Sequence, residues 1–260
     1  MDNNTEKDTD VILEVKDLKT YFKTGPHKVV KAVEGVNFSL RKGKVLGIIG
    51  ESGSGKSVTA RSILRIVESP GYIAGGEIRF KGQDILKLPE KEMKSIRGNE
   101  ISMIFQEPMP SLTHIIRCGK QIAESLRLHR GMKKKEAMEE AIKMMQAVGI
   151  ANPQARAYEN PHQMSGGMRQ RCALIRTLAT EPEILLLDEP FSALDYQTRL
   201  AVSADIWRIL QQEGKTALLV THDIAEAVSM SDRVVVLSRR PAVVKAEMDM
   251  GALRGLPPVS

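Results

Sequence analysis

A glycine-rich octapeptide, Gly50–Ser57, has the residue types and the spacing that hold phosphate groups. It fits the pattern G-x-x-x-x-G-K-[ST] and directly follows the apolar run 45–49 (VLGII). Its backbone N–H groups, and those of a helix beginning after it, would bind phosphate oxygens, and its glycines let the backbone approach closely. Lys56 would reach the β- and γ-phosphates, and the Ser57 hydroxyl would coordinate Mg²⁺. The octapeptide therefore predicts nucleoside triphosphate binding, with an ordinary glycine-rich turn as the alternative. The residues expected to contact the nucleotide here are Gly50, Glu51, Ser52, Gly53, Ser54, Gly55, Lys56, Ser57 and Val58.

Two carboxylates end a second apolar run, ILLLDEP at 184–190. The carboxyl ends of parallel strands form the ligand edge of an open α/β sheet, so Asp188 and Glu189 are expected at that edge. Asp188 would contact Mg²⁺, usually through water, and Glu189 would orient or deprotonate the attacking water. A strand that ends in a solvated acidic turn is the alternative interpretation.

Two single residues follow other strand-like runs. Gln106 comes directly after ISMIF (101–105), where its amide could touch Mg²⁺ or the attacking water. His222 ends LLVTH, where a neutral imidazole could hydrogen-bond a γ-phosphate. Without further evidence, a glutamine or histidine at the end of a strand is more often structural than catalytic, so a structural role is the alternative for both residues.

A second anion site is predicted at Ser165-Gly166-Gly167, because a serine and two glycines precede the helical pattern CALIRTLAT. One chain does not need two sites for a γ-phosphate. The economical explanation is that this segment closes over a nucleotide held by another copy.

The elements that must position these residues have an α/β pattern. Short apolar runs at 45–49, 101–105, 184–187, 217–220 and 233–237 alternate with helical segments, and 11–15, 36–40 and 77–80 add further strands. We predict an α/β fold of the P-loop NTPase (RecA-like) type, with an N-terminal antiparallel β portion. Residues 107–160 contain only helix-period segments and are expected to form an inserted helical subdomain. The expected divisions are a polar tail at 1–10, the ATPase domain at 11–240 and a short tail at 241–260.

Composition narrows the class of protein. The chain has 260 residues, is 42% hydrophobic and carries a net charge of +6. Its basic residues are scattered without interleaved aromatic residues, which argues against nucleic acid as a partner. No apolar run reaches the 18 or more residues of a membrane helix, and no secretory signal is expected, so cytoplasm is the predicted location. Cys118 and Cys172 match no metal spacing; they could form one disulfide, but buried free thiols fit a reducing compartment better and are expected.

The order and spacing of SGG, Asp188-Glu189, SALD (192–195) and THD (221–223) resemble the ATP-binding cassette ATPases over about residues 11–240. The resemblance implies that two cassettes pair head to tail, each ATP lying between the phosphate loop of one and the SGG segment of the other. It implies that Phe22 stacks on adenine, with Tyr21 as the alternative, and that Asp195 contributes to the nucleotide site. It also implies that Gln106 is the Q-loop residue and that His222 is the switch residue. The implied signature segment consists of Ser165, Gly166, Gly167 and Met168.

The two halves of the chain resemble different importer subunits. The first half (ESGSGKSVTARSILRI, QEPMPSL) is similar to dipeptide, oligopeptide and nickel importer ATPases, and the second half (PHQMSGGMRQR, LSRRP) to nitrate, sulfonate and taurine importer ATPases. The halves join near residue 161. The resemblance implies an ATP-hydrolysing, Mg²⁺-dependent importer subunit on the cytoplasmic face of the membrane, with di- or oligopeptides or nickel as the expected cargo. Its implied partners are transmembrane permease subunits, a second cassette and, indirectly, a substrate-binding protein.

Three alternatives remain at this stage. The first is an importer of the nitrate, sulfonate or taurine type. The second is a soluble, non-transport cassette ATPase of DNA repair or translation. The third is a small-molecule P-loop kinase, which would leave the SGG segment unexplained.

Overall fold

The computed structural model describes residues 10–106, 112–192, 194 and 196–251. They fall into two compact units. Unit 1 joins the chain up to Lys94 to the segment from Gly214 onward, and unit 2 is Ser95–Glu213.

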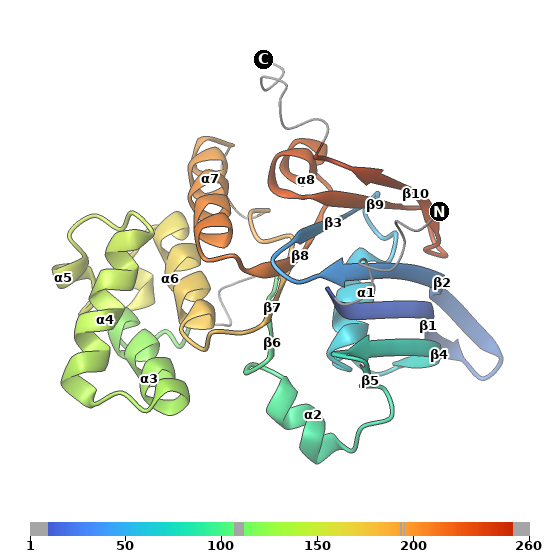
Figure 1. Cartoon of the computed structure of the whole chain (residues 1–260), viewed down its shortest axis with the longest axis horizontal. Helices are drawn as coiled ribbons and strands as arrows, with labels where there is room; N and C mark the ends of the chain where they lie inside the picture. Colours follow the sequence, from blue (N-terminus) through green and yellow to red (C-terminus); the bar gives the residue numbers. More distant parts are fainter. Residues whose placement is uncertain (1–9, 107–111, 193, 195, 252–260) are drawn as a thin grey trace, which may run out of the picture. The chain divides into compact units, whose positions relative to one another are not determined.

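Unit 1 contains an antiparallel sheet with the strand order β2-β1-β4-β5 (Figure 1). Its strands are β1 (Val11–Gly25), β2 (Lys28–Arg41), β4 (Gly71–Phe80) and β5 (Gln83–Asp84). Leu13, Val15 and Leu18 of β1 are buried and fix the inner face of this sheet. The strands extend well beyond the predicted runs, because polar residues such as Lys23 continue the pairing toward the hairpin, where Lys23 lies opposite Val29.

Unit 1 also contains a group of strands with the order β10-β9-β3-β8. In it, β3 (Val45–Ile49) pairs in parallel with β8 (Thr216–Thr221) and with β9 (Arg233–Leu237). Helix α1 (Lys56–Ile63) follows β3, and α8 (Ile224–Met230) follows β8. The continuous apolar composition of the parallel strands β3, β8 and β9 reflects burial on both faces of the sheet.

Part of the segment expected as a C-terminal tail, 241–260, is instead integrated into unit 1. Ala242 is buried and forms a parallel bridge with Val33, and β10 (Val244–Asp249) pairs antiparallel with β9. The sequence VKAEMD lacks the apolar pattern of a core strand because its residues are mostly exposed at the edge of the sheet. Its pairing therefore depends on β9 rather than on its own composition.

Unit 2 combines a parallel strand pair with a group of helices. β6 (Ile101–Ile104) pairs with β7 (Ile184–Asp188), and α7 (Tyr196–Gln212) follows β7. The helices between these strands are α3 (Cys118–Arg130), α4 (Lys134–Ala147), α5 (Pro153–Arg156) and α6 (Gly166–Leu178). Helix α2 (Glu90–Ile96) lies where the division between the units falls.

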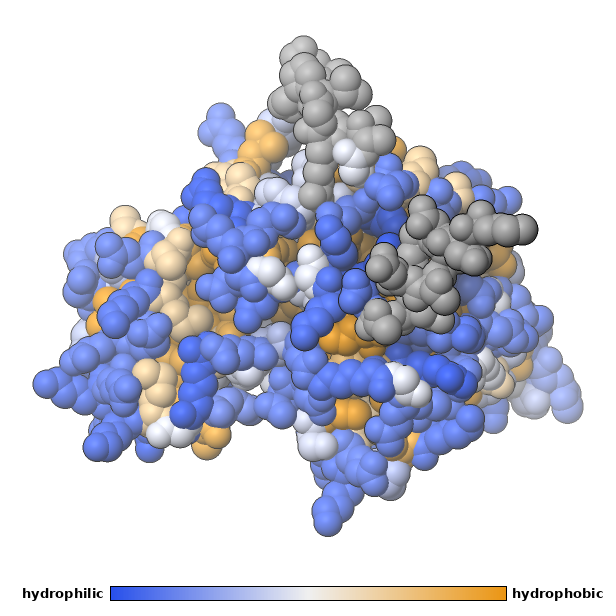
Figure 2. All heavy atoms as spheres, in the orientation of Figure 1, coloured by the Kyte–Doolittle hydropathy of each residue, from blue (hydrophilic) through white to orange (hydrophobic). Residues whose placement is uncertain are grey.

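One hydrophobic cluster joins α3, α4 and α6. It includes Ile122, Leu126, Met145 and Ile175, and it extends past residue 160 because α6 supplies part of it. Hydrophilic side chains cover most of these helices on the face shown in Figure 2. Throughout the described ranges, no helix has both the length and the apolar character needed to cross a bilayer.

The two cysteines meet inside this cluster. Cys118 begins α3 and Cys172 lies on α6, and both are free thiols with no exposed surface. Their side chains share a hydrogen bond that, together with burial, raises the pKa of Cys172. The fold therefore brings together two thiols that are far apart in the sequence.

Candidate functional site

The phosphate loop, Gly50–Ser57, connects β3 to α1 in unit 1. Gly55 precedes the helix with φ +100°, and a Cβ there would lie 2.6 Å from the Ala32 carbonyl oxygen. The site therefore requires glycine for both its conformation and its space. At Gly50, a Cβ would lie 2.7 Å from Ser54 Oγ, so the start of the loop also folds tightly on itself.

Lys56 is buried and turns back over the phosphate loop. Its Nζ donates hydrogen bonds of 2.8 Å to the Gly50 carbonyl oxygen and 2.9 Å to that of Glu51. These carbonyls hold the ammonium group beside the N-terminus of α1. A bound phosphate would meet a cation that is already in place.

The first turn of α1 carries Ser57 and Val58, both half-buried. The helix is anchored to the antiparallel sheet through a buried hydrogen bond of 2.8 Å between Thr20 Oγ1 and Ser62 Oγ. This contact ties the helix that follows the loop to β1.

His222 lies at the same edge of the parallel strands as the phosphate loop. Thr221 pairs with Ile49, so the residues that follow them, His222 and Gly50, leave adjacent strands at equivalent positions. His222 is exposed, and the Asp223 side chain caps α8 by accepting hydrogen bonds from Ala225 N and Glu226 N. The phosphate loop and His222, the two predicted phosphate-binding features of unit 1, thus both lie at the carboxyl edge of these strands.

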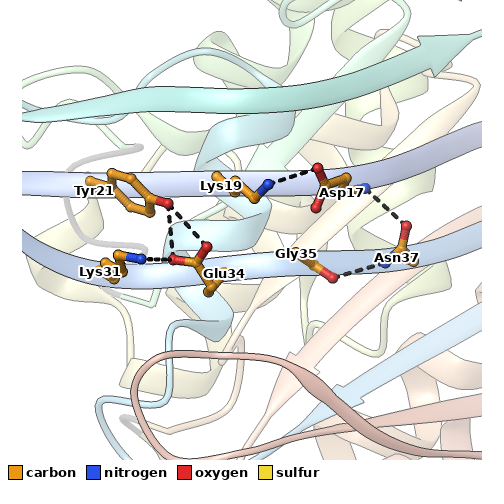
Figure 3. Close-up of polar contacts among 7 residues, drawn as sticks. All are labelled: Asp17, Lys19, Tyr21, Lys31, Glu34, Gly35 and Asn37. Carbon is orange, nitrogen blue, oxygen red and sulfur yellow. Dashed lines mark hydrogen bonds and ion pairs between the residues drawn. The ribbon is translucent and has the colours of Figure 1, made fainter.

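The two aromatic residues considered for adenine stacking have different surroundings on β1. Phe22 is half-buried and packs over Gly71, where a Cβ would come within 2.6 Å of its ring. Tyr21 instead donates hydrogen bonds from its hydroxyl to Glu34, at 2.9 Å from Oε2, and Lys31 Nζ lies 3.0 Å from the same oxygen (Figure 3). Lys31 and Tyr21 lower the pKa of Glu34 through these hydrogen bonds. Stacking of either ring on adenine stays a prediction.

In unit 2, Gln106, Asp188 and Glu189 lie at the ends of β6 and β7. Ile104 pairs with Leu187, which places Asp188 and the residue after Ile104 at the same edge. Asp188 is fully buried, whereas Glu189 is half-buried and has a left-handed φ of 45°. Gln106 Nε2 donates a hydrogen bond of 3.2 Å to Glu189 Oε2. The structure thus brings together the predicted amide and the predicted base.

The signature segment, Ser165–Met168, begins α6. Ser165 is exposed at the N-cap, and its Oγ accepts a hydrogen bond of 3.3 Å from Met168 N. The first turn contains no acidic residue, so no carboxylate of that turn offsets the positive end of the helix dipole. Such an N-terminus favours an anion. Asp195, the other residue expected to serve the nucleotide, lies outside the described residues.

The oxygen donors of Ser57, Gln106 and Asp188 suit Mg²⁺, a hard cation that prefers oxygen. The described residues contain no group of three or more His, Cys, Asp or Glu side chains that could hold a metal ion by themselves. Mg²⁺ in proteins commonly takes further ligands from a nucleotide and from water.

The sequence interpretation missed the segment Ser238–Ala242, which we call the arginine loop. It packs against the phosphate loop in unit 1, where Arg239 Nε lies 2.6 Å from Glu51 Oε2. The adjacent arginines in LSRRP were the available signal, but their position after β9 says nothing about which loop they contact.

Comparisons with known proteins show what the chain as a whole is similar to. A family model described as ABC transporter matches residues 33–192. The chain is 43% identical over 229 residues to a probable peptide ABC transporter ATP-binding protein of Sinorhizobium fredii, covering 88% of this chain and 68% of that protein. It is 44% identical over 228 residues to the oligopeptide transport ATP-binding protein OppD of Bacillus subtilis, covering 87% of this chain and 63% of that protein. The chain thus spans about two thirds of the length of these relatives.

A solved structure is also similar. It is a dimeric, post-hydrolysis state of the ATP-binding cassette MJ0796 bound to ADP and Pi, with a TM-score of 0.78 and 27% identity over 92% of this chain and 98% of that one. These similarities confirm the predicted α/β fold of the P-loop NTPase type and the predicted resemblance to cassette ATPases.

Proposed function

The chain belongs to the ABC transporter family of ATP-hydrolysing transporter subunits, and we propose that it powers a membrane importer of peptides. The observation that carries this proposal is the phosphate loop, with Lys56 held at the N-terminus of α1 in a chain similar to peptide-transport subunits. The peptide-type relatives match 87–88% of the chain, so the match continues beyond residue 161 into the half that resembles sulfonate-type subunits. This extent favours peptides over nitrate, sulfonate or taurine.

The chemistry assigned to the chain is hydrolysis of the β–γ phosphoanhydride bond of ATP. Lys56 and the backbone of the phosphate loop would bind the phosphates. Glu189 would accept a proton from the attacking water, and Gln106 would orient the Glu189 carboxylate through the hydrogen bond between them. Mg²⁺, when bound, would supply charge neutralisation, with Ser57, Asp188 and Gln106 as its proposed protein contacts. His222 would hydrogen-bond the γ-phosphate.

The proposed assembly is a pair of cassettes, identical or paralogous, docked on two transmembrane permease subunits at the cytoplasmic face of the membrane. The signature segment supports pairing, because an exposed helix N-terminus with no acidic residue in its first turn suits the γ-phosphate of a nucleotide held by a second cassette. A substrate-binding protein would deliver the peptide to the permease rather than to this chain.

The test is to purify the chain together with the membrane proteins encoded beside its gene and to measure ATP hydrolysis and tripeptide uptake in proteoliposomes. We expect a co-purified permease, with hydrolysis and uptake that the variant Lys56→Ala abolishes. Taurine in place of the tripeptide serves as the matched cargo control. Uptake of taurine but not of the peptide would move the assignment to the sulfonate type. Hydrolysis by a chain that associates with no membrane protein would support the soluble cassette ATPase instead.

A further inference from the structure

The arginine loop, Ser238–Ala242, follows β9 and is joined to β2 through Ala242. Ser238 Oγ lies 2.8 Å from the carbonyl oxygens of Arg239 and Pro241 and accepts a hydrogen bond of 3.1 Å from Val243 N. At the other end, Ala242 N donates to the Ala32 carbonyl at 3.0 Å. Ser238 thus closes the loop on itself and Ala242 joins it to β2, while its two arginine side chains are exposed.

The arginine loop packs directly against the phosphate loop. A Cβ on Gly55 would come within 3.0 Å of Ala242 Cβ, and one on Gly50 within 3.1 Å of the Leu237 carbonyl oxygen. Gly55 thus leaves room for Ala242 of the arginine loop, whereas Gly50 borders the end of β9, directly before that loop.

Arg239 compensates a charge that opposes the predicted ligand. Glu51 belongs to the phosphate loop, and its carboxylate would repel a triphosphate at short range. Arg239 Nε lies 2.6 Å from Glu51 Oε2 and pairs with this charge. Because both side chains are largely exposed, the ion pair is expected to add little to folding stability, and its effect should appear in ligand binding.

Arg240 adds a second cation to the same loop. Its Nη2 lies 3.7 Å from the position that a Cβ on Gly53 would occupy. Within the described residues, no hydrogen bond or ion pair engages the Arg240 guanidinium. Because Arg239 neutralises Glu51, the guanidinium of Arg240 and the ammonium of Lys56 give the arginine loop and the phosphate loop together a net positive charge.

We propose that Arg240 is a further cationic ligand for the phosphates of the nucleotide, and that Arg239 is a positioning residue that acts through Glu51. This inference rests on the proposed nucleotide binding by the phosphate loop and extends it to residues beyond the motif. A guanidinium offers several N–H donors to phosphate oxygens, and charge-assisted hydrogen bonds of this kind are among the stronger ones in proteins.

The test of Arg240 compares the full chain with Arg240→Gln for binding of Mg²⁺-ATP by calorimetry at several salt concentrations. The control is Lys245→Gln, which removes one positive charge from exposed β10. We expect Arg240→Gln to raise the Kd about tenfold, to weaken its dependence on salt, and to leave the thermal unfolding midpoint within the range of the control.

The alternative outcomes are distinguishable. Suppose that Arg240→Gln and Lys245→Gln bind Mg²⁺-ATP equally at every salt concentration while Lys56→Ala loses binding. The proposed role of Arg240 would then be wrong, but the proposed nucleotide site at the phosphate loop would still be supported. If the wild-type chain does not bind Mg²⁺-ATP, the proposed function itself fails.

A double-mutant cycle tests Arg239. We expect Arg239→Gln to raise the Kd about threefold when Glu51 is present, and to have no effect in the Glu51→Gln background, where no carboxylate needs compensation. An equal rise in both backgrounds would show that Arg239 acts on the nucleotide directly, and the positioning role would be wrong.

Discussion

Gln106 Nε2 donates a hydrogen bond of 3.2 Å to Glu189 Oε2, joining two residues that are 83 positions apart in the chain. They follow β6 and β7, whose parallel register brings their carboxyl ends together. The left-handed φ of 45° at Glu189 turns the chain sharply after β7. This contact leaves the Glu189 carboxylate half-buried with an amide donor, an arrangement suited to a base that must be oriented before it meets water.

Replacement of Glu189 by glutamine should separate nucleotide binding from chemistry. In Glu189→Gln the side-chain shape remains and its amide oxygen can still accept the hydrogen bond from Gln106, but the group that removes a proton from water is lost. We expect ATP hydrolysis in the assembled complex to fall by about a hundredfold or more, with the Kd for ATP almost unchanged. Glu136→Gln, at an exposed position on α4, is the control and should keep full activity. Hydrolysis close to the wild-type rate would exclude Glu189 as the base.

Mixed pairs of two inactive chains should recover activity if cassettes pair head to tail. Lys56→Ala removes the cation of the phosphate loop, whereas Ser165→Arg would obstruct the anion site proposed at the start of α6 and leaves the residues of the phosphate loop unchanged. A pair containing one of each variant has one composite site free of both changes. We expect part of the hydrolysis to return in isolated mixed complexes and none in either uniform complex. A verified mixed complex without any recovery would contradict this pairing.

A methyl group at Gly55 should cost much more stability than one at Gly131, although both glycines have positive φ. At Gly55 the Cβ would lie 2.6 Å from the Ala32 carbonyl oxygen, whereas at Gly131 it would meet nothing within 4 Å. We expect Gly131→Ala to lower the free energy of unfolding by about 1 kcal/mol and Gly55→Ala by about 3 kcal/mol or more. Urea unfolding of the two variants measures the difference. Equal losses would mean that the backbone conformation, rather than the close contact, explains the glycine at position 55.

Cys172 should resist alkylation in the folded protein. Its hydrogen bond to Cys118 and its burial raise its pKa, so the reactive thiolate is scarce at neutral pH and the sulfur is inaccessible. We expect iodoacetamide at pH 8 to modify Cys172 at least about a hundredfold more slowly in native buffer than in urea, as followed by peptide mass spectrometry. Rapid modification of the folded chain would show that the helix cluster around α6 opens readily.

The phosphate loop, the signature segment and most strands and helices could be predicted from the sequence because their determinants are local. The spacing of Gly50, Gly55 and Lys56 lies within eight consecutive residues, and the apolar runs of β3 and β7 mark buried strands without reference to any partner. Gln106, Asp188 and Glu189 could be placed at the ends of strands for the same reason, since each follows, or ends, such a run.

Contacts between distant segments depended on the tertiary structure. Arg239 and Glu51 are 188 positions apart, and no pattern in either segment indicates that the arginine loop meets the phosphate loop. The contact of Cys118 with Cys172 likewise arises from the packing of α3 against α6. Strand β10 could not be recognised because an exposed edge strand is stabilised by backbone hydrogen bonds to β9, and these bonds do not depend on side-chain type. Local patterns determine which residues can do chemistry, whereas long-range pairing decides which other side chains surround them.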